Sequence, residues 1–350
     1  MAWDLETSLK KAKIEKEWIF GDRYFRIGDP FQWVDGDLQI SKSDFRGSID
    51  FMQWISGYYE KYETLKEFKY KNYNNDYKKI LGIYNSIFNS YFPFLTNKEK
   101  KFRKKNLVCH SLARIQDYCV IKKYAKNLKA SKIEHLDFGP GLGGNAVYSL
   151  RLLGANYTSI EAHHWSYNIQ RMFFSKLLSD NEKYLDLTVA ESFGKQKKDL
   201  ISLCNSKNFQ IKQIPSWHFD YINNESKDLI TATTCLNEIN TAGIIYFLFN
   251  ANRVLKKNGY LYIRDSAKLK PNRHEVNYDE VLTKHFGFKL VKDFRYLTNR
   301  KDIFALPRLY KKVKAKTKAL NFDELFNLIL GRYAVTSHGS SNSQNLKKNN

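Results

Sequence analysis

Three glycines, Gly139, Gly141 and Gly144, follow a short apolar segment at the spacing G-x-G-x-x-G and precede a helix-like segment. Such a loop lets the backbone approach a nucleotide closely, and on its own the spacing fits a dinucleotide-binding enzyme equally well. Asp137 lies inside the apolar segment, two residues before the first glycine. A carboxylate there would repel a pyrophosphate, so it suits a ligand that carries an amine or a sulfonium. A further glycine, Gly143, lets the loop lie against an uncharged nucleoside.

The segments around this loop alternate between strand-like and helix-like patterns. Short apolar runs predict strands at 133–138, 157–161, 209–214, 228–233 and 259–264. Apolar residues at helical spacing predict helices at 145–153, 166–178 and 243–255. Strands that alternate with helices imply a parallel sheet with helices on both faces. Two further strands, 288–296 and 303–310, are expected to form an antiparallel pair at one edge of the sheet.

The regions on either side of the sheet have a different character. Residues 1–130 are predicted to be mainly helical and aromatic-rich, with helical spacing at 51–70, 77–91 and 107–128. We interpret this part as a substrate or lid region. Residues 311–350 are expected to form a basic extension with one short helix at 322–330 and a polar, disordered tail from 337.

The motifs resemble those of the class I S-adenosylmethionine (SAM) dependent methyltransferases. Leu136-Asp-Phe-Gly-Pro-Gly-Leu-Gly143 resembles the first motif of that family, and 228–233 and 256–263 resemble its fourth- and fifth-strand motifs. The resemblance covers 131–310, which we therefore expect to be the SAM-binding domain. It implies an α/β fold with a doubly wound, Rossmann-like sheet of seven strands.

The resemblance also implies which residues hold the cofactor. Glu161 ends the second strand, where the family places the acid that takes both ribose hydroxyls, and a carboxylate can accept both donors of a cis-diol. Trp217 falls where the family frames the adenine. Many members of the family have an acid closely after the third strand, whereas here Asp220 comes only after Trp217 and His218. The alternative is that Trp217 is a buried core residue. The expected cofactor-binding residues are Asp137, Gly139, Gly141, Gly143, Glu161, Trp217 and Asn237.

A narrower resemblance concerns the acceptor. The aromatic N-terminal region, the extended glycine loop, Asn237-Glu238 and Arg273-His274-Glu275 are similar to bacterial sugar O-methyltransferases, which are associated with surface polysaccharides and glycosylated natural products. That family implies a sugar hydroxyl as acceptor, in a glycan, a nucleotide-sugar or a glycosylated natural product.

Methyl transfer to a hydroxyl needs an aligned acceptor and assistance from a base or a metal. Candidates should follow the carboxyl ends of the strands. His274 is our first choice as base because histidine titrates near neutrality, with a solvated loop histidine as the alternative. Glu238 and Asp265 complete the expected catalytic set. His163 and His164 adjoin the ribose acid and are a second choice.

Two further roles remain open from the residues alone. Glu238 and Asp265 could hold a divalent metal, but two carboxylates and an amide are a thin ligand set, so hydrogen bonding is the preferred role. Arg114 lies four residues after His110 on one face of a predicted helix. It could reach the SAM carboxylate or an anionic substrate, or it could be a surface arginine.

The charge is large and uneven. The chain of 350 residues has 58 basic and 36 acidic residues, a formal net charge of +22, yet 151–250 is neutral. The flanking runs, such as Lys101–Lys105 and Lys311–Lys318, can attract nucleic acid, an anionic membrane surface or a phosphorylated substrate. A solvated face in a lysine-rich sequence explains them equally well. The expected partner is a small-molecule or glycan acceptor, with nucleic acid less favoured.

Composition sets the class of protein. An apolar fraction of 43% fits a packed globular chain. No apolar run approaches the roughly 20 residues that span a bilayer, and the acidic start does not suit a signal peptide. The four cysteines form no C-x-x-C pair, which argues against zinc and redox roles. We therefore expect a cytoplasmic protein.

Two other functions stay open. An RNA methyltransferase is supported by the net charge, although Asn237-Glu238 lacks the Asn/Asp-Pro-Pro-aromatic signature of base-amine methylation. A non-catalytic SAM-binding subunit, with a basic tail that docks on a partner, is the third reading. A methyltransferase for another small molecule also remains open.

Overall fold

The structure, a computed structural model, describes residues 73–91, 97–128, 132–162, 164–236, 239, 241–265, 274–276, 278–294, 306–313, 324–325 and 334–336. The expected helix at 51–70 and the polar tail from 337 lie outside these residues, as does most of the expected helix at 322–330. None of the helices in the described ranges combines the length and apolar character that crossing a membrane requires.

A sheet of eight strands forms the centre of the fold. Its order is β3-β4-β2-β1-β5-β6-β9-β8, and the first six strands are parallel whereas β9 is antiparallel to both of its neighbours. The strands are β1 (Glu134–Phe138), β2 (Asn156–Glu161), β3 (Tyr184–Asp186), β4 (Ile211–Pro215), β5 (Lys227–Thr233), β6 (Leu255–Asp265), β8 (Phe288–Asp293) and β9 (Leu306–Lys312). The strand order reverses between β1 and β5, which makes this a doubly wound, Rossmann-like sheet.

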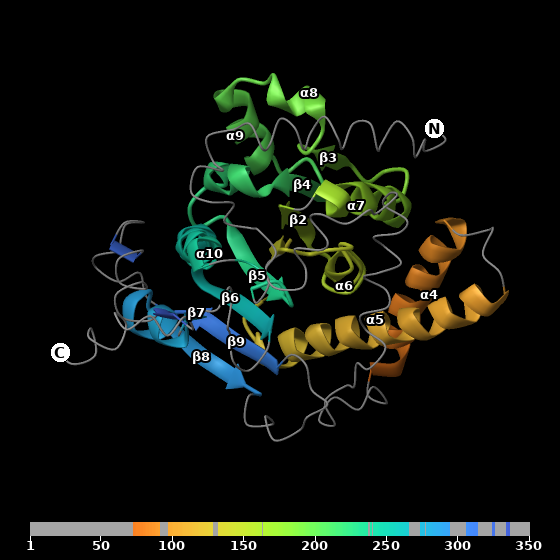
Figure 1. Ribbon diagram of the computed structural model, residues 1–350, viewed down its shortest axis with the longest axis horizontal. Coiled ribbons are helices and arrows are strands. Elements are labelled where there is room, and N and C mark those ends of the chain that lie inside the picture. Colours follow the sequence, from red (N-terminus) through yellow and green to blue (C-terminus); the bar gives the residue numbers. More distant parts are fainter. Residues whose placement is uncertain are drawn as a thin grey trace.

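Helices cover both faces of the sheet (Figure 1). One hydrophobic cluster joins the sheet to α4 (Asn74–Tyr91), α5 (Asn97–Tyr124), α6 (Asn145–Arg151) and α7 (His164–Leu177). A second cluster on the opposite face joins it to α9 (Lys197–Asn205), the 3-10 helix η4 (Ser216–Tyr221), α10 (Thr241–Val254) and the π-helix η6 (Val281–His285). The smaller elements are α8 (Ala190–Phe193), α11 (Tyr278–Glu280) and the antiparallel pair of β7 (His274–Val276) and β10 (Ala334–Thr336).

The two faces of the central strands carry different side chains. Because side chains alternate along a strand, Leu136 and Phe138 of β1 enter the second cluster, where the Phe138 and Phe247 rings lie 4.6 Å apart. His135 and Asp137 of the same strand are also fully buried, but on the face that α5 covers. That face holds a stripe of buried polar residues, from which the candidate site is built.

The architecture confirms the fold class expected from the sequence. The five parallel strands and the antiparallel edge pair lie where they are predicted, and β3 adds one strand to the expected seven. The helix expected at 107–128 begins ten residues earlier, since α5 spans Asn97–Tyr124. The sequence pattern did not predict β3, α8, α9 or the β7–β10 pair. The three-part division at 130 and 310 stays a prediction.

Candidate cofactor-binding and active site

The glycine loop joins β1 to α6 at the carboxyl edge of the sheet. Gly139, Gly141 and Gly143 have φ angles of 61°, 56° and 78°, in the left-handed region that favours glycine. A Cβ at Gly139 would lie 2.5 Å from the Cβ of Cys235, and one at Gly143 would lie 2.6 Å from the Phe174 ring. A Cβ at Gly141 would meet nothing within 4 Å. Two glycines therefore allow tight packing, whereas the third faces open space that a ligand can fill.

Glu161, at the end of β2, contacts this loop directly. Its Oε2 accepts a hydrogen bond from the Gly141 N–H at 3.1 Å, and its Oε1 accepts from the Ala162 N–H at 2.8 Å. The side chain is 7% exposed. The acid expected to bind ribose thus lies beside the glycine that faces open space.

Gln170 of α7 joins the loop to Glu161. Its Nε2 donates to the Gly141 carbonyl at 2.7 Å and lies 3.3 Å from the Glu161 Oε2, while its Oε1 accepts from the Ser159 hydroxyl at 2.6 Å. Gln170 is fully buried. One side chain therefore fixes the position of both the loop and the acid. The sequence carried a signal for it, because Gln170 interrupts the apolar helical face formed by Phe173, Phe174 and Leu177.

Asp137 lies in β1, just before the glycine loop, and is fully buried. Its oxygens accept hydrogen bonds from Tyr157 Oη and Thr231 Oγ1, each at 2.6 Å. Burial raises the pKa of this carboxyl to about 6, although these hydrogen bonds and the Arg114 charge oppose the shift. Asp137 thus belongs to a buried polar network beneath the glycine loop, which we call the floor of the site. Its contact with a ligand stays a prediction.

Arg114 of α5 reaches the same floor. Its Nη1 donates to Asn145 Oδ1 at 2.9 Å and to Thr233 Oγ1 at 3.3 Å, and it lies 3.3 Å from Asp117 Oδ2. The side chain is 5% exposed, so it is not the surface arginine of the alternative reading. Its Nε would lie 3.1 Å from a Cβ placed at Gly144. The guanidinium therefore sits between the glycine loop and the end of β5.

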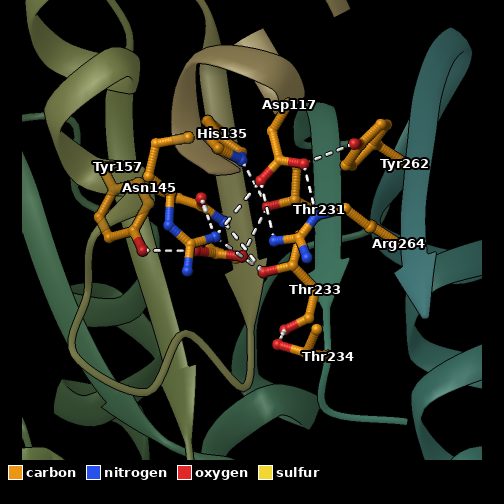
Figure 2. A network of polar contacts seen from close by, with 11 residues as sticks. Asp117, His135, Asn145, Tyr157, Thr231, Thr233, Thr234, Tyr262 and Arg264 are labelled. Carbon is orange, nitrogen blue, oxygen red and sulfur yellow. Dashed lines mark hydrogen bonds and ion pairs between the residues drawn. The ribbon is translucent and has the colours of Figure 1, made fainter. Parts of the chain in front are cut away.

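A second buried arginine extends the network to β6. Arg264 Nε contacts Asp117 Oδ1 at 2.6 Å, and Tyr262 Oη donates to the same oxygen at 2.6 Å (Figure 2). Two arginines thus face the two carboxylates of Asp117 and Asp137, which balances the charge of the network. The network attaches α5 to the carboxyl ends of β1, β5 and β6.

His135 belongs to the network but is held neutral. Its Nδ1 lies 2.9 Å from Ser149 Oγ, and its Nε2 lies 2.8 Å from Thr231 Oγ1. Burial, with a smaller contribution from Lys227, lowers its pKa to about 3. Because the single Thr231 hydroxyl proton is donated to Asp137, Thr231 accepts from His135. The geometry therefore favours the tautomer that carries its proton on Nε2.

The remaining predicted residues are placed to different extents. Trp217 lies in η4, is 9% exposed and meets the Tyr167 ring edge-on at 6.5 Å between centroids. Asp265 is fully buried at the end of β6, where its Oδ2 accepts from the Leu236 N–H at 2.9 Å. His274 lies in β7, opposite Thr336 of β10. Asn237 and Glu238 lie outside the described residues.

The structure therefore brings together one part of the predicted site. The glycine loop, Asp137 and Glu161 meet at the ends of the adjacent strands β1 and β2, and Asp265 lies two strands farther along the same edge. Within the described ranges, no group of three or more His, Cys, Asp or Glu side chains could hold a metal ion. Gln170, Asn145 and the Asp117–Arg264 pair were not predicted from the sequence.

Comparison with known proteins gives a likeness in structure only. No protein-family model and no curated protein matches the sequence. A SAM dependent methyltransferase from Aquifex aeolicus has a TM-score of 0.38 and 17% identity, over 56% of this chain and 89% of that one. A methyltransferase from Pyrococcus furiosus has a TM-score of 0.38 and 12% identity, over 58% and 85%. Phosphoethanolamine N-methyltransferase 2 from Haemonchus contortus, in complex with SAM, has a TM-score of 0.37 and 11% identity, over 58% and 53%.

Proposed function

We propose that this protein is a SAM-dependent methyltransferase. The observation that carries the proposal is the arrangement at the ends of β1 and β2. Gly141 faces open space at a left-handed φ of 56°, and Glu161 Oε2 lies 3.1 Å from its amide nitrogen. An open loop beside a carboxylate suits a nucleoside with a free ribose diol, because the carboxylate accepts both hydroxyls.

The residues of the site suit the two ends of such a cofactor. Glu161 would bind the ribose, and Trp217 in η4 would lie next to the adenine, beside the end of β4. Arg114 is the basic group beside the glycine loop, and it would attract the carboxylate of the methionine part. SAM supplies an electrophilic methyl group on a sulfonium.

The acceptor that we propose is a sugar hydroxyl. This part rests on the resemblance in the sequence to sugar O-methyltransferases. His274 would take the hydroxyl proton as general base, and Glu238 and Asp265 would orient the acceptor. Asp265 stands at the carboxyl end of β6, the edge where parallel sheets of this kind bind ligands.

An RNA acceptor is the second candidate. It is favoured by a cluster of lysines on the described surface, Lys123, Lys289, Lys292 and Lys311. A non-catalytic SAM-binding subunit is the third. The three readings share the same cofactor site and differ in whether a methyl group is transferred and to which acceptor.

The test separates cofactor binding from methyl transfer. Isothermal titration with SAM and with S-adenosylhomocysteine measures binding by the wild type and by Glu161→Ala. Methyl-labelled SAM with a fractionated extract of the source cells then locates the acceptor. Label in nucleotide-sugar or polysaccharide material, absent with the variant, supports the sugar reading. Label in nuclease-sensitive material replaces it with the RNA reading, and lack of SAM binding by the wild type rejects the proposal.

A further inference from the structure

A cluster of four lysines lies where α5 meets the antiparallel edge of the sheet. We call it the lysine surface, and it consists of Lys123 of α5, Lys289 and Lys292 of β8, and Lys311 of β9. Lys123 and Lys289 are exposed, and Lys292 and Lys311 are partly exposed. Figure 1 shows the end of α5 close to these strands.

The register of β8 places its two lysines on one face. Lys289 pairs with Lys311, and Lys292 pairs with Leu309, because the register shifts between Leu290 and Lys292. Residues 309 and 311 share one face of β9, since side chains alternate. The irregularity therefore keeps Lys289 and Lys292 on the same face, although they are three positions apart and would point to opposite faces of a regular strand.

Aromatic rings hold three of the ammonium groups in place. Lys292 Nζ lies 5.5 Å from the Tyr124 ring centroid and 5.0 Å from that of Phe294, and Lys123 Nζ lies 5.2 Å from Tyr124. Lys311 Nζ lies 6.0 Å from the ring of Tyr260. Cation–π contacts of this kind restrain an ammonium group without neutralising its charge.

Two members of the lysine surface, Lys289 and Lys311, carry charges that no acid in the described ranges pairs with. Lys289 and Lys311 stand directly opposite each other, a placement that is destabilising for like charges. Within the described chain neither of them forms an ion pair. The acid of β8, Asp293, pairs in register with Arg308 and so points to the other face. Neither β9 nor the last turns of α5, residues 118–124, contain an acid.

We propose that the lysine surface binds the phosphodiester backbone of a single-stranded nucleic acid. Four charges spread over two strands and a helix end fit a row of phosphates better than one small anion. A membrane surface also attracts lysines, but peripheral binding usually adds inserted apolar side chains. Among the described residues, the large exposed hydrophobic ones are Val291 and Val313, each 36% exposed. Two half-covered valines offer little apolar area for insertion into a bilayer. The sequence also continues from β9 into Lys314-Ala-Lys-Thr-Lys318.

This inference does not rest on the proposed function. Lys311 pairs with Tyr260, near the start of the parallel part of β6, whereas the glycine loop lies at the opposite end of the strands. Substitutions on the lysine surface should therefore leave SAM binding unchanged. A nucleic acid bound here could be a substrate or a docking partner.

The experiment measures binding of a fluorescent 20-nucleotide oligo(U) by anisotropy over a series of KCl concentrations. The variant replaces Lys123, Lys289, Lys292 and Lys311 with Gln. The matched control replaces four exposed lysines, Lys183, Lys195, Lys198 and Lys207, which lie around β3 and α9 at the other end of the sheet. Both variants lose the same charge. Circular dichroism and SAM titration check that each one is folded.

The expected result is a loss confined to the first variant. Each lost contact with a single strand lowers the slope of log K against log salt by about 0.7, so the slope should fall by roughly 3. The control should keep most of the wild-type slope. Equal losses in both variants would show binding by net charge alone and overturn the proposal. Binding to vesicles with 30% phosphatidylserine but not to oligo(U) would also overturn it, in favour of a membrane.

Discussion

Asp117 and Arg264 form a fully buried ion pair, with Asp117 Oδ1 2.6 Å from Arg264 Nε and both side chains at 0% exposure. The two residues are 147 positions apart in the sequence. The pair joins α5, which precedes the sheet, to the end of β6, next to Asp265. Helix α5 is therefore part of the structure that positions the candidate site.

Removing one partner of this pair should be strongly destabilising. Asp117→Asn leaves the Arg264 charge without its carboxylate, and breaking a buried pair costs about 3–5 kcal/mol. Urea unfolding measures the loss. Lys284→Ala is the control, because it removes a more exposed pair with Glu280, and such pairs contribute about 0–1 kcal/mol. A loss no larger than that of the control would mean that Asp117 does not organise this region.

Two glycines of the loop should respond differently to alanine. Gly143→Ala places a methyl group 2.6 Å from the Phe174 ring at a φ of 78°, so we expect a marked loss of stability. Gly141→Ala meets no atom within 4 Å and should cost only the strain of its φ, about 1 kcal/mol. Its methyl group would occupy the space we assign to the cofactor, so SAM binding should weaken at least tenfold.

Thermal unfolding and SAM titration of both variants check this difference. The control is Gly194→Ala, which lies in open surroundings away from the loop and has a φ of −79°. It should change neither stability nor affinity by much. A Gly141→Ala variant that binds SAM as well as the wild type would show that the space beside Gly141 is not the cofactor site.

The sequence predicts the parts of the fold that depend on local pattern. Asp137 and Glu161 lie near the ends of strands β1 and β2, whose apolar runs are short and clear, and the glycine loop follows the first of them, so these positions were predictable. The strand β3 was not, because it has only three residues, all of them partly exposed. The start of α5 was obscured by the run of lysines at 100–105. Asp117 and Arg264 look like ordinary charged residues until the sheet brings them together.

Gln170 should act as a positioning residue for the ribose acid. In Gln170→Glu, a carboxylate replaces the amide that lies 3.3 Å from Glu161 Oε2. Two carboxylates this close cannot both ionise easily, so one pKa rises. We expect SAM affinity to fall at least tenfold at pH 8 and to recover partly toward pH 6 as the pair takes up a proton.

SAM titration at several pH values tests the role of Gln170. Gln210→Glu serves as the control, because Gln210 Oε1 accepts from the Lys183 N–H at the far edge of the sheet. A structural defect alone would weaken binding by Gln170→Glu equally at every pH. Such a pH-independent loss would contradict the positioning role.

A buried lysine at the amino end of β5, Lys227, should make the free energy of unfolding rise with pH. Burial, reinforced by Lys212, lowers the pKa of Lys227 to about 7 from 10.5, although Glu134 opposes the shift. Between these values the unfolded chain binds more protons than the folded one. The free energy of unfolding should therefore rise from pH 7 toward pH 10, by at most about 1.4 kcal/mol per pH unit from this group.

The variant Lys227→Met removes the buried charge and should reduce this rise. Below pH 7 it also relieves the cost of burying an ammonium group, although it takes a partner from Thr158, whose Oγ1 lies 2.9 Å from Lys227 Nζ. Urea unfolding at pH 7, 8 and 9 compares it with Lys183→Met, which removes an exposed lysine and should retain the wild-type slope. If Lys227→Met keeps that slope as well, the ammonium of Lys227 does not titrate in this range and another group causes the rise.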